Sequence, residues 1–332
     1  MKRRDFIVGA AGFWLLTVCA QGASAAKKRL AVVTPATPAE EIKSKSNLYY
    51  RALFLELSRR GFTEHDDLVI DIYSGHGDTS KYGELAQRVV DAAPDVILCV
   101  AGLLSSELKV RTSVIPIVAI VADPVASGLV SNLARPDANL TGVTVDAGME
   151  LYGKRLSLLA ELVPQLNRVG YLSSHKNWQR AAGSAVREAS KRIGITLIPA
   201  DLGETYNASA YADAFASLRD QRPEALLISD EPEHLRNQKT LIELAAKNKI
   251  PTMYPFRELT ASGGLVSYSV NLVEAYRYAA GEIAQIFSGR NPSDIPFYQP
   301  TSFQLTINLR AAQLLNIKVP PALLAQADEV IE

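Results

Sequence analysis

The stretch Val121-Ala-Asp-Pro-Val-Ala-Ser-Gly-Leu-Val-Ser-Asn-Leu-Ala-Arg-Pro-Asp-Ala-Asn-Leu-Thr-Gly142 decides how the fold is interpreted. It follows the apolar run Ile115–Ile120, which predicts a buried strand. Asp123 and Pro124 then stand where that strand would end. Because proline fixes its own φ and disfavours the helical region for the residue before it, Asp-Pro predicts a sharp exit from the strand. Small ligands bind outside the carboxyl ends of strands in open α/β sheets, so the segment predicts a ligand site.

Strand-like and helix-like segments alternate from Arg29 onward, which predicts an α/β fold with parallel sheets and helical crossovers. The pattern restarts at Met149, so we expect two doubly wound parallel-sheet lobes joined by a hinge of several short strands. The expected strands are 30–33, 68–73, 95–100, 116–120, 140–145, 168–172, 196–199, 225–229, 250–253 and 265–268. The expected helices are 48–60, 82–92, 105–111, 149–162, 179–193, 208–219, 233–248 and 272–287.

Residues 1–26 have the pattern of an export signal. Lys2, Arg3 and Arg4 precede the apolar core Phe6–Ala20, and Ala23-Ser24-Ala25 offers a small-residue cleavage site. The core is too short for a membrane span. The pair Arg3-Arg4 favours a twin-arginine signal over an ordinary secretory one. We therefore expect a periplasmic protein.

The two cysteines of the sequence do not predict a disulfide bond or a redox function. Cys19 offers lipid anchoring as an alternative, although Val18 is a poor residue to precede a lipidated cysteine. After cleavage the remaining cysteine is Cys99, inside the apolar run Val96–Val100. One cysteine cannot form an internal disulfide, so Cys99 is expected to be a small core residue.

The size and net charge of the chain further restrict the possible classes of function. Roughly 306 residues after cleavage favour two lobes, and 48% hydrophobic residues suffice for two cores. The signal carries three basic residues and one acidic residue, which leaves a mature charge near −2. A nucleic-acid partner would need a clustered basic face, so none is expected.

The segment Val121–Gly142 closely resembles the signature of a family of ABC-transporter substrate-binding proteins, in which tryptophan- and tyrosine-binding members are the nearest functional reference. The C-terminal stretch Phe303–Ile331 also matches the family. The resemblance implies a type I periplasmic binding fold, whose chain crosses between the lobes about three times. We expect crossings near Val145, Tyr268 and Thr301. Lobe 1 would then comprise 27–145 plus about 269–300, and lobe 2 would comprise 146–268 plus about 301–332.

A two-lobe binder of this kind holds its ligand in the cleft, where loops follow strands of both lobes. Aromatic side chains in these loops could stack on a planar ligand. The expected ligand-binding residues are Thr34, Gly102, Ser105, Asp123, Pro124, Asn177, Trp178, Asp230, Tyr254, Tyr268 and Asn271. The expected ligand is an aromatic amino acid or an aromatic or other organic acid.

Several of these residues also have purely structural interpretations. The loop Ala101–Ser106 leads into a helix whose free N–H groups suit a carboxylate, but Ser105 could simply cap that helix. Asp123 could accept a ligand ammonium or bond its own turn, and the two roles are compatible. Asp230 occupies the matching place in lobe 2, in the sequence Ser-Asp-Glu-Pro, which is also typical of a helix start.

Other function classes lack their motifs. The four histidines have no metal-binding spacing, and no Gly-x-Ser-x-Gly elbow or nucleotide motif occurs. We therefore expect neither an enzyme nor a metal or cofactor, and the export signal replaces the DNA-binding segment of a regulator. The expected partners are an ABC permease and a separate ATPase, with membrane contact only through the permease and the protein itself a monomer. A sensor that presents the ligand to a membrane receptor remains the alternative.

Overall fold

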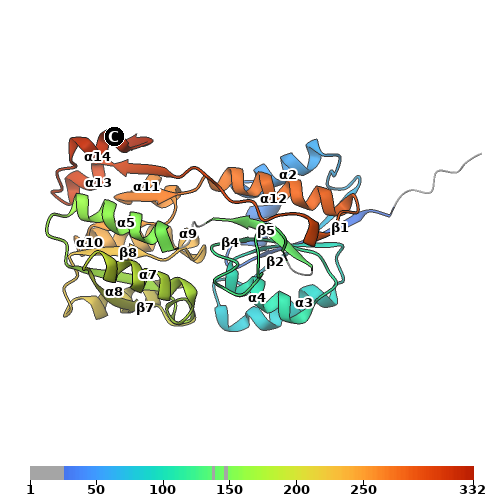
Figure 1. The fold of residues 1–332 in the computed structure, drawn as a ribbon, viewed down its shortest axis with the longest axis horizontal. Coiled ribbons are helices and arrows are strands. Elements are labelled where there is room, and N and C mark those ends of the chain that lie inside the picture. The colour runs from blue at the N-terminus through green and yellow to red at the C-terminus, as the bar shows by residue number, and fades with distance from the viewer. Residues whose placement is uncertain (1–25, 137–138, 146–148) are drawn as a thin grey trace, which may run out of the picture.

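The computed structural model describes residues 26–136, 139–145 and 149–332. Two sheets form the cores of two lobes, which lie side by side along the long axis (Figure 1). The first sheet is parallel, with strand order β2-β1-β3-β4-β5. The second has the order β12-β11-β10-β9-β8-β6-β7. The expected fold class of two α/β lobes is confirmed.

Lobe 1 contains the first sheet and the helices that cover it. Its elements are β1 (Lys28–Thr34), α1 (Ala39–Lys43), α2 (Leu48–Arg59), β2 (Leu68–Ser74), η1 (Thr79–Lys81), α3 (Tyr82–Asp91), β3 (Val96–Val100), α4 (Gly102–Arg111), β4 (Ile117–Val121), β5 (Leu140–Thr144), α12 (Leu272–Phe287) and η2 (Pro292–Asp294).

Lobe 2 contains the second sheet. Its elements are α5 (Met149–Leu162), β6 (Arg168–Ser173), α6 (His175–Gln179), α7 (Ala181–Arg192), β7 (Thr196–Asp201), α8 (Ala208–Leu218), β8 (Ala225–Ile228), α9 (Glu233–Arg236), α10 (Gln238–Lys247), β9 (Thr252–Tyr254), α11 (Arg257–Ala261), β10 (Val266–Ser269), β11 (Gln304–Asn308), α13 (Leu309–Leu314), α14 (Pro321–Gln326) and β12 (Glu329–Ile331).

The central strands β3, β4 and β8 are buried along their whole length because helices cover both sides of each sheet. In β1, Leu30 and Val32 pack in the core that includes α2 and α12, whereas Ala31 and Val33 pack in the core that includes α3 and α4. Successive side chains of a strand point to opposite faces, so one short strand contributes to two cores. Cys99 of β3 is fully buried in the second of these cores.

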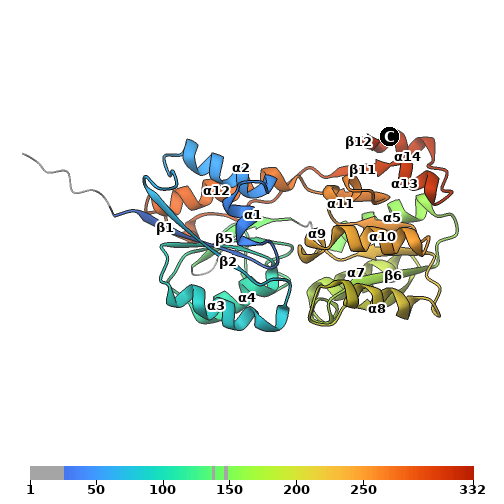
Figure 2. The ribbon, with the colours of Figure 1, turned by 180° about the vertical axis from the view of Figure 1, so that it is seen from behind.

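The chain passes between the lobes in three places. It leaves β5 in lobe 1 and enters α5 in lobe 2, returns from β10 to α12, and runs from the neighbourhood of Tyr298, which bonds β5, into β11. Figure 2 shows α12 beside α2, although the two helices are far apart in the sequence. Three short connections at one edge leave the opposite ends of the lobes joined only by non-covalent contacts.

The structure differs from the sequence expectations in several elements, including two divided helices and the added strand β11. The helix expected over 179–193 is two helices, α6 and α7, which meet at Arg180. The helix expected over 233–248 is likewise divided into α9 and α10 at Asn237. Strand β11 runs antiparallel to β10, so the second sheet is mixed. None of the helices in the described ranges combines the length and apolar character that a membrane span requires.

Gly142 permits the close approach of β5 to β4. A Cβ at this position would lie 1.9 Å from the backbone oxygen of Ala119, and strand backbones cannot move apart without breaking their ladder. We therefore expect Gly142→Ala to lower the free energy of unfolding by about 3 kcal/mol.

Gly153→Ala is the matched control, because a Cβ on Gly153 in α5 meets no atom within 4 Å. It should leave stability unchanged or raise it by up to about 1 kcal/mol. Denaturant unfolding of both variants measures the difference. Equal midpoints for Gly142→Ala and wild type would contradict the packing argument.

Candidate ligand-binding site between the lobes

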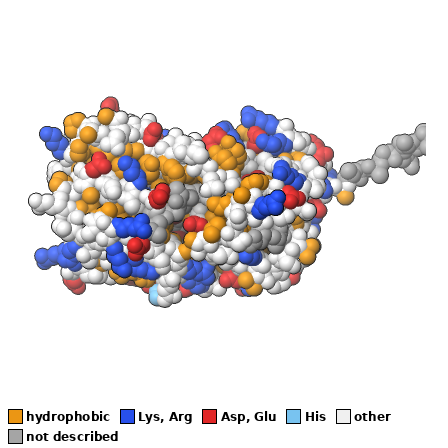
Figure 3. Space-filling view, viewed as in Figure 1, with side chains coloured by type: hydrophobic (Ala, Val, Ile, Leu, Met, Phe, Trp, Pro, Cys, Tyr) orange, Lys and Arg blue, Asp and Glu red, His pale blue; other side chains and the backbone are white. Residues whose placement is uncertain are grey.

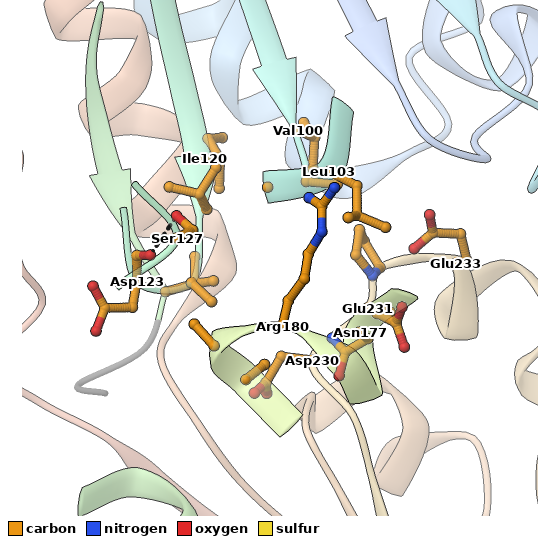
Figure 4. A pocket seen from close by; sticks show the side chains of 18 of the residues that line it. Val100, Leu103, Ile120, Asp123, Ser127, Asn177, Arg180, Asp230, Glu231 and Glu233 are labelled. Carbon is orange, nitrogen blue, oxygen red and sulfur yellow. Dashed lines mark hydrogen bonds between the residues drawn. The ribbon is translucent and has the colours of Figure 1, made fainter. Parts of the chain in front are cut away.

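A pocket lies between the lobes, at the carboxyl ends of the central strands of both sheets (Figure 4). Lobe 1 contributes the ends of β3 and β4 and parts of α2, α4 and α12. Lobe 2 contributes α5, α6, α7 and the loops after β8 and β9. The cavity volume is about 170 Å³, which is close to the ~150 Å³ of an apolar cavity that takes benzene. The pocket therefore suits a small ligand with one planar ring system.

The first turn of α4 faces this pocket. Gly102 and Leu103 line it, and the N–H of Ser105 donates to the carbonyl of Ala101 at 3.0 Å. The N–H groups before Ser105 have no acceptor within the helix, as at the start of any α-helix. Their positions and the helix dipole favour a negatively charged group here.

Arg180 brings a positive charge to the same pocket from lobe 2. Figure 4 shows its side chain extending toward Val100 and Leu103 of lobe 1. The ion pairs formed by the described residues do not include Arg180. A guanidinium and a helix N-terminus that face each other both favour an anion between them.

The junction of α6 and α7 positions Arg180. A Cβ on Gly183 would lie 2.0 Å from the backbone oxygen of Trp178, so only glycine allows α7 to approach α6 this closely. The N–H of Arg180 donates to the carbonyl of Asn177 at 3.1 Å, which closes the turn. The Arg180 side chain therefore starts from a tightly held backbone.

Asp123 shapes its own turn and also lines the pocket. Its Oδ1 accepts hydrogen bonds from the N–H groups of Val125 at 3.0 Å and Ala126 at 2.9 Å, and its carbonyl accepts one from the hydroxyl of Ser127 at 2.6 Å. The Asx-turn interpretation is thus present in the structure. The hydrogen bonds that the described residues donate to this carboxylate use Oδ1 only.

Asp230 is paired with the buried Arg155. The two side chains form an ion pair in which they are 6% and 2% exposed. Arg155 also donates to the carbonyls of Tyr268 at 2.9 Å and Pro255 at 3.3 Å. A buried charge is stable only when it is paired, so the ion pair with Arg155 accounts for the burial of Asp230 at the edge of the pocket.

Two more carboxyl groups follow Asp230. Glu231 accepts hydrogen bonds from the Ser174 hydroxyl at 2.5 Å, the Ser174 N–H at 3.0 Å and the Ser229 hydroxyl at 2.6 Å. Burial raises the pKa of Glu231, and these donors oppose the rise. Glu233 accepts a hydrogen bond from the Tyr82 hydroxyl of lobe 1. Burial, and then the charge of Glu231, raise the pKa of Glu233 to about 7.

His234 completes this buried network as a neutral ring. Burial lowers the pKa of His234 to about 3. Its Nε2 lies 2.9 Å from the Ser229 hydroxyl, and its Nδ1 lies 2.7 Å from the Tyr211 hydroxyl. Because Ser229 gives its hydrogen to Glu231, Nε2 donates to Ser229, and Nδ1 accepts from Tyr211. His234 is therefore a structural residue and has no metal-ligating geometry.

Aromatic rings line the pocket on the side near the hinge. Tyr49 of α2 stacks on Tyr276 of α12 with ring centroids 5.5 Å apart. Both rings line the pocket with Phe256 of lobe 2 and Tyr152 of α5. These walls suit the flat faces of a planar ligand.

Of the eleven residues expected from the sequence to contact ligand, four line the pocket: Gly102, Asp123, Asn177 and Asp230. Gly102, Asp123 and Asp230 lie just after the carboxyl ends of strands, whereas Asn177 lies within α6. Sequence reasoning missed Arg180, Tyr49, Tyr152, Tyr276 and Glu233 among the lining residues. Arg180 was missed because it lies inside an expected helix. The tyrosines were missed because they lie on helices, whereas ligand contacts were expected only in the loops after strands.

Three of the other seven residues serve loops and helix starts next to the pocket. The Thr34 side chain is buried and accepts from the N–H of Thr37 at 3.2 Å. The Ser105 hydroxyl donates to Ala101 at 2.9 Å, within α4. The carbonyl of Pro124 accepts from Leu129 at 2.8 Å and holds the signature loop together.

The remaining four residues pack or cap elsewhere. Trp178 packs on Tyr171, and the Arg187 guanidinium lies 4.5 Å from its ring centroid. Tyr254 is 1% exposed in the core. Tyr268 stacks on Phe303 at a centroid distance of 5.6 Å, and Asn271 caps α12 by accepting from Glu274 at 3.2 Å.

The lobes also contact each other outside the pocket. The N–H of Tyr206 donates to the carbonyl of Gly77 at 3.0 Å. The N–H and hydroxyl of Thr79 bond the carbonyl and the carboxylate of Glu204 at 3.0 and 2.9 Å. These contacts join lobe 1 to lobe 2 away from the three chain connections between the lobes, so the cleft is covered on this side.

The described residues include no group of three or more His, Cys, Asp or Glu side chains that could hold a metal ion. On the face shown in Figure 3, basic and acidic side chains are interspersed over both lobes. Among the described residues that line the pocket, Arg180 supplies a basic group, and several acidic side chains stand around an apolar centre.

Comparisons with known proteins agree with this geometry. A family model described as ABC transporter substrate binding protein matches residues 50–331. The tyrosine-binding protein of Clostridioides difficile (strain R20291) is 23% identical over 266 residues, which cover 79% of this chain and 74% of that protein.

Solved structures share the type I periplasmic binding fold. A conserved domain protein from Vibrio cholerae has a TM-score of 0.80 at 21% identity, covering 92% of this chain and 99% of that chain. An ABC domain from Streptococcus pneumoniae in complex with L-Trp has a TM-score of 0.79 at 20% identity, covering 92% and 100%. The ligand-free, open structure of a Clostridium difficile substrate-binding protein with adhesive properties has a TM-score of 0.60 at 19% identity, covering 92% and 99%.

The resemblance noted in the segment Val121–Gly142 is thus confirmed by a family match that spans most of the sequence. The match includes the elements of lobe 2 and most of lobe 1, whereas β1, α1 and the first residues of α2 precede it. The chain belongs to the family of ABC transporter substrate-binding proteins.

Proposed function

We propose that the protein is the solute-binding component of an ABC importer and captures a small organic ligand by closing its lobes. The observation that carries this proposal is the pocket, whose walls come from both lobes. A ligand there contacts both lobes only when they are together, so it favours the closed arrangement over an open one.

The ligand's carboxylate would lie between Arg180 and the first turn of α4. Both groups are positive toward the pocket, and they come from different lobes. An anion between them bonds both lobes at once. Charge-assisted hydrogen bonds of this kind are about twice as strong as neutral ones.

The body of the ligand would be a planar ring against Tyr276 and Phe256. Asp123 and Asp230 line the same pocket and could accept an ammonium group, whereas Gly102 and Asn177 would add polar contacts. An aromatic amino acid fits all of these groups, and an aromatic or other organic acid fits the positive end and the rings. The relatives that bind tyrosine or L-Trp support the first of these classes.

The structure represents the closed arrangement in this proposal. The chain superposes on the L-Trp complex with a TM-score of 0.79 and on the ligand-free open structure with 0.60, at nearly equal identity and coverage. The hydrogen bonds between Gly77–Thr79 and Glu204–Tyr206 support the same interpretation. Opening the hinge would break these bonds before it disturbed either core.

The site of action would be the periplasm. Residues 1–26 have the pattern of an export signal, of the twin-arginine type, and nearly all of them lie outside the described residues. The partners would be a membrane permease and a separate ATPase, which recognise the closed monomer. The two bodies that move about the hinge would be the lobes predicted from the sequence, 27–145 with 269–300 and 146–268 with 301–332.

Ligand binding should be visible with L-tyrosine and L-tryptophan. We expect each to raise the melting temperature, because a ligand that binds the native state stabilises it by RT ln(1 + [L]/Kd), about 2.7 kcal/mol at a hundredfold excess over Kd. The radius of gyration from X-ray scattering should fall on addition of the same compounds. A screen that extends to aromatic and other organic acids and gives no shift would contradict the proposed ligand class, and compounds that bind without compaction would contradict closure.

Removal of the pocket's positive charge should weaken binding. Arg180→Ala is expected to lower ligand affinity about 10- to 100-fold, because it removes a charge-assisted hydrogen bond to the carboxylate. Arg192→Ala is the control, because that side chain is 65% exposed at the far end of α7. Calorimetric titration measures both. Unchanged affinity in Arg180→Ala would show that the ligand carboxylate does not bind Arg180.

The two roles of Asp123 can be separated by one substitution. Asp123→Asn keeps the Oδ1 acceptor that bonds Val125 and Ala126 but removes the negative charge. Stability should stay within about 1 kcal/mol of wild type. Affinity for an amino acid should fall more than affinity for the matching acid without the amino group. Equal losses for both ligands would show that Asp123 only shapes the turn.

A further inference from the structure

Two tyrosines of lobe 1 interact with two glutamates of lobe 2, one through a hydrogen bond and one through its electrostatic effect. The Tyr82 hydroxyl of α3 donates to Glu233 at the start of α9. Tyr49 of α2 lies close enough to Glu258 of α11 that this carboxyl group adds to the effect of burial in raising the pKa of the Tyr49 hydroxyl. Tyr49 and Tyr82 belong to cores on opposite faces of the lobe-1 sheet, so these faces approach lobe 2 in two separate places.

The Tyr82–Glu233 contact is the one that can be tested apart from the ligand. Tyr82 does not line the pocket, and it is 2% exposed. Glu233 is also 2% exposed, although it stands at the edge of the pocket. Each side chain is therefore covered in part by the opposite lobe, and a hinge opening would return both to water.

Glu233 is poorly provided with donors in this arrangement. Its Oε1 accepts from Tyr82, but its Oε2 is buried and has no hydrogen-bond partner among the described residues. The neighbouring Glu231 has three donors, which oppose the rise in its pKa, and its carboxyl group adds to the effect of burial in raising the pKa of Glu233. A buried carboxyl group with one donor and a charged acid beside it is more stable with a proton.

We propose that the Tyr82–Glu233 contact sets ligand affinity by stabilising the closed lobes, and that closure takes up a proton at Glu233. The proposal rests on the ligand capture proposed above. Tyr82 then acts as a positioning residue that never touches the ligand, and Glu233 links the ligand pocket to the lobe interface.

The groups around Glu233 determine the direction of this effect. From its own loop comes Glu231, from α3 Tyr82, and from α9 the neutral His234. The network also includes Tyr206 from the loop after β7 and Tyr211 from α8, which sense the charges of Glu231 and Glu233. Three of the basic side chains on this side of lobe 2 have acidic partners: Lys176 pairs with Glu204, Arg236 with Glu41 and Arg155 with Asp230. Arg180 lines the same pocket as Glu233 and extends toward lobe 1, and it is not among the groups that shift the pKa of Glu233.

The direction of the pH effect on affinity follows from the pKa of Glu233 in the open and closed forms. In the open form the Glu233 carboxyl group faces water and has its ordinary pKa, near 4.5, whereas in the closed form burial raises the pKa to about 7. Between these values the closed form carries a proton that the open form lacks. The closed form is therefore favoured at low pH, and this advantage is lost as the pH rises through about 7. Affinity should be about tenfold higher at pH 6 than at pH 8.

The experiment is calorimetric titration of L-tyrosine and L-tryptophan at pH 6, 7 and 8. Wild type should lose about tenfold in affinity from pH 6 to pH 8. Glu233→Gln, which resembles the protonated acid, should bind at pH 8 about as tightly as at pH 6. Tyr82→Phe should bind about tenfold more weakly than wild type, because the Glu233 carboxyl loses its donor when the lobes close.

Tyr278→Phe serves as the control, because this tyrosine is 44% exposed on α12 and contacts Tyr298 of its own lobe. It should match wild type at every pH. A Glu233→Gln variant that keeps the wild-type pH slope, or that binds more weakly by the same factor at each pH, would overturn the proposal. Wild-type affinity in Tyr82→Phe would also overturn it.

Failure of the proposed ligand class gives a different result. Wild type would then bind neither amino acid, and the contact would be tested by scattering without ligand. The wild-type radius of gyration should be smaller at pH 6 than at pH 8, and Glu233→Gln should not show this change. Equal radii for wild type at both pH values would overturn the closure contact itself.

Discussion

One buried guanidinium group organises the ligand-facing edge of lobe 2. Arg155 is 1% exposed, and it bonds Asp230 after β8, the carbonyl of Pro255 after β9 and the carbonyl of Tyr268 in β10. Since an unpaired charge in a protein interior is very unfavourable, these three partners must stay together around it. The edges of three neighbouring strands are thereby fixed as one unit. Lobe 2 presents a rigid wall to the cleft, and the freedom of the molecule is left to its hinge.

The parts of the site that follow directly from strand ends could be predicted from the sequence. Asp123 and Asp230 each follow an apolar strand, and the topology of parallel sheets brings such positions to one edge. Gly102 follows for the same reason, because it begins the helix after β3. The fold class was accessible for a related reason: the alternation of strands and helices restarts once. These features depend on local pattern and on topology, which the sequence records.

Other parts of the site depend on long-range contacts, which a local sequence pattern cannot predict. Arg180 sits at a break between two helices, and that break is imposed by the approach of Gly183 to the backbone of Trp178. Tyr254 was expected in a loop, yet it is the last residue of β9, and its ring packs where a Cβ on Gly264 would be only 2.5 Å away. A shift of one residue at a strand end turns a side chain from the cleft to the core. The contact between Tyr82 and Glu233 joins residues 151 positions apart and appears only when both lobes are placed.

The position of Cys99 has a practical consequence. This thiol is fully buried in β3, and burial raises its pKa to about 12, so it is neither accessible nor ionised in the folded protein. It is the sole cysteine after residue 26. A cysteine introduced on the surface of either lobe would thus be the one site open to a maleimide dye. The native scaffold is already suited to conversion into a fluorescent sensor, without prior removal of any residue.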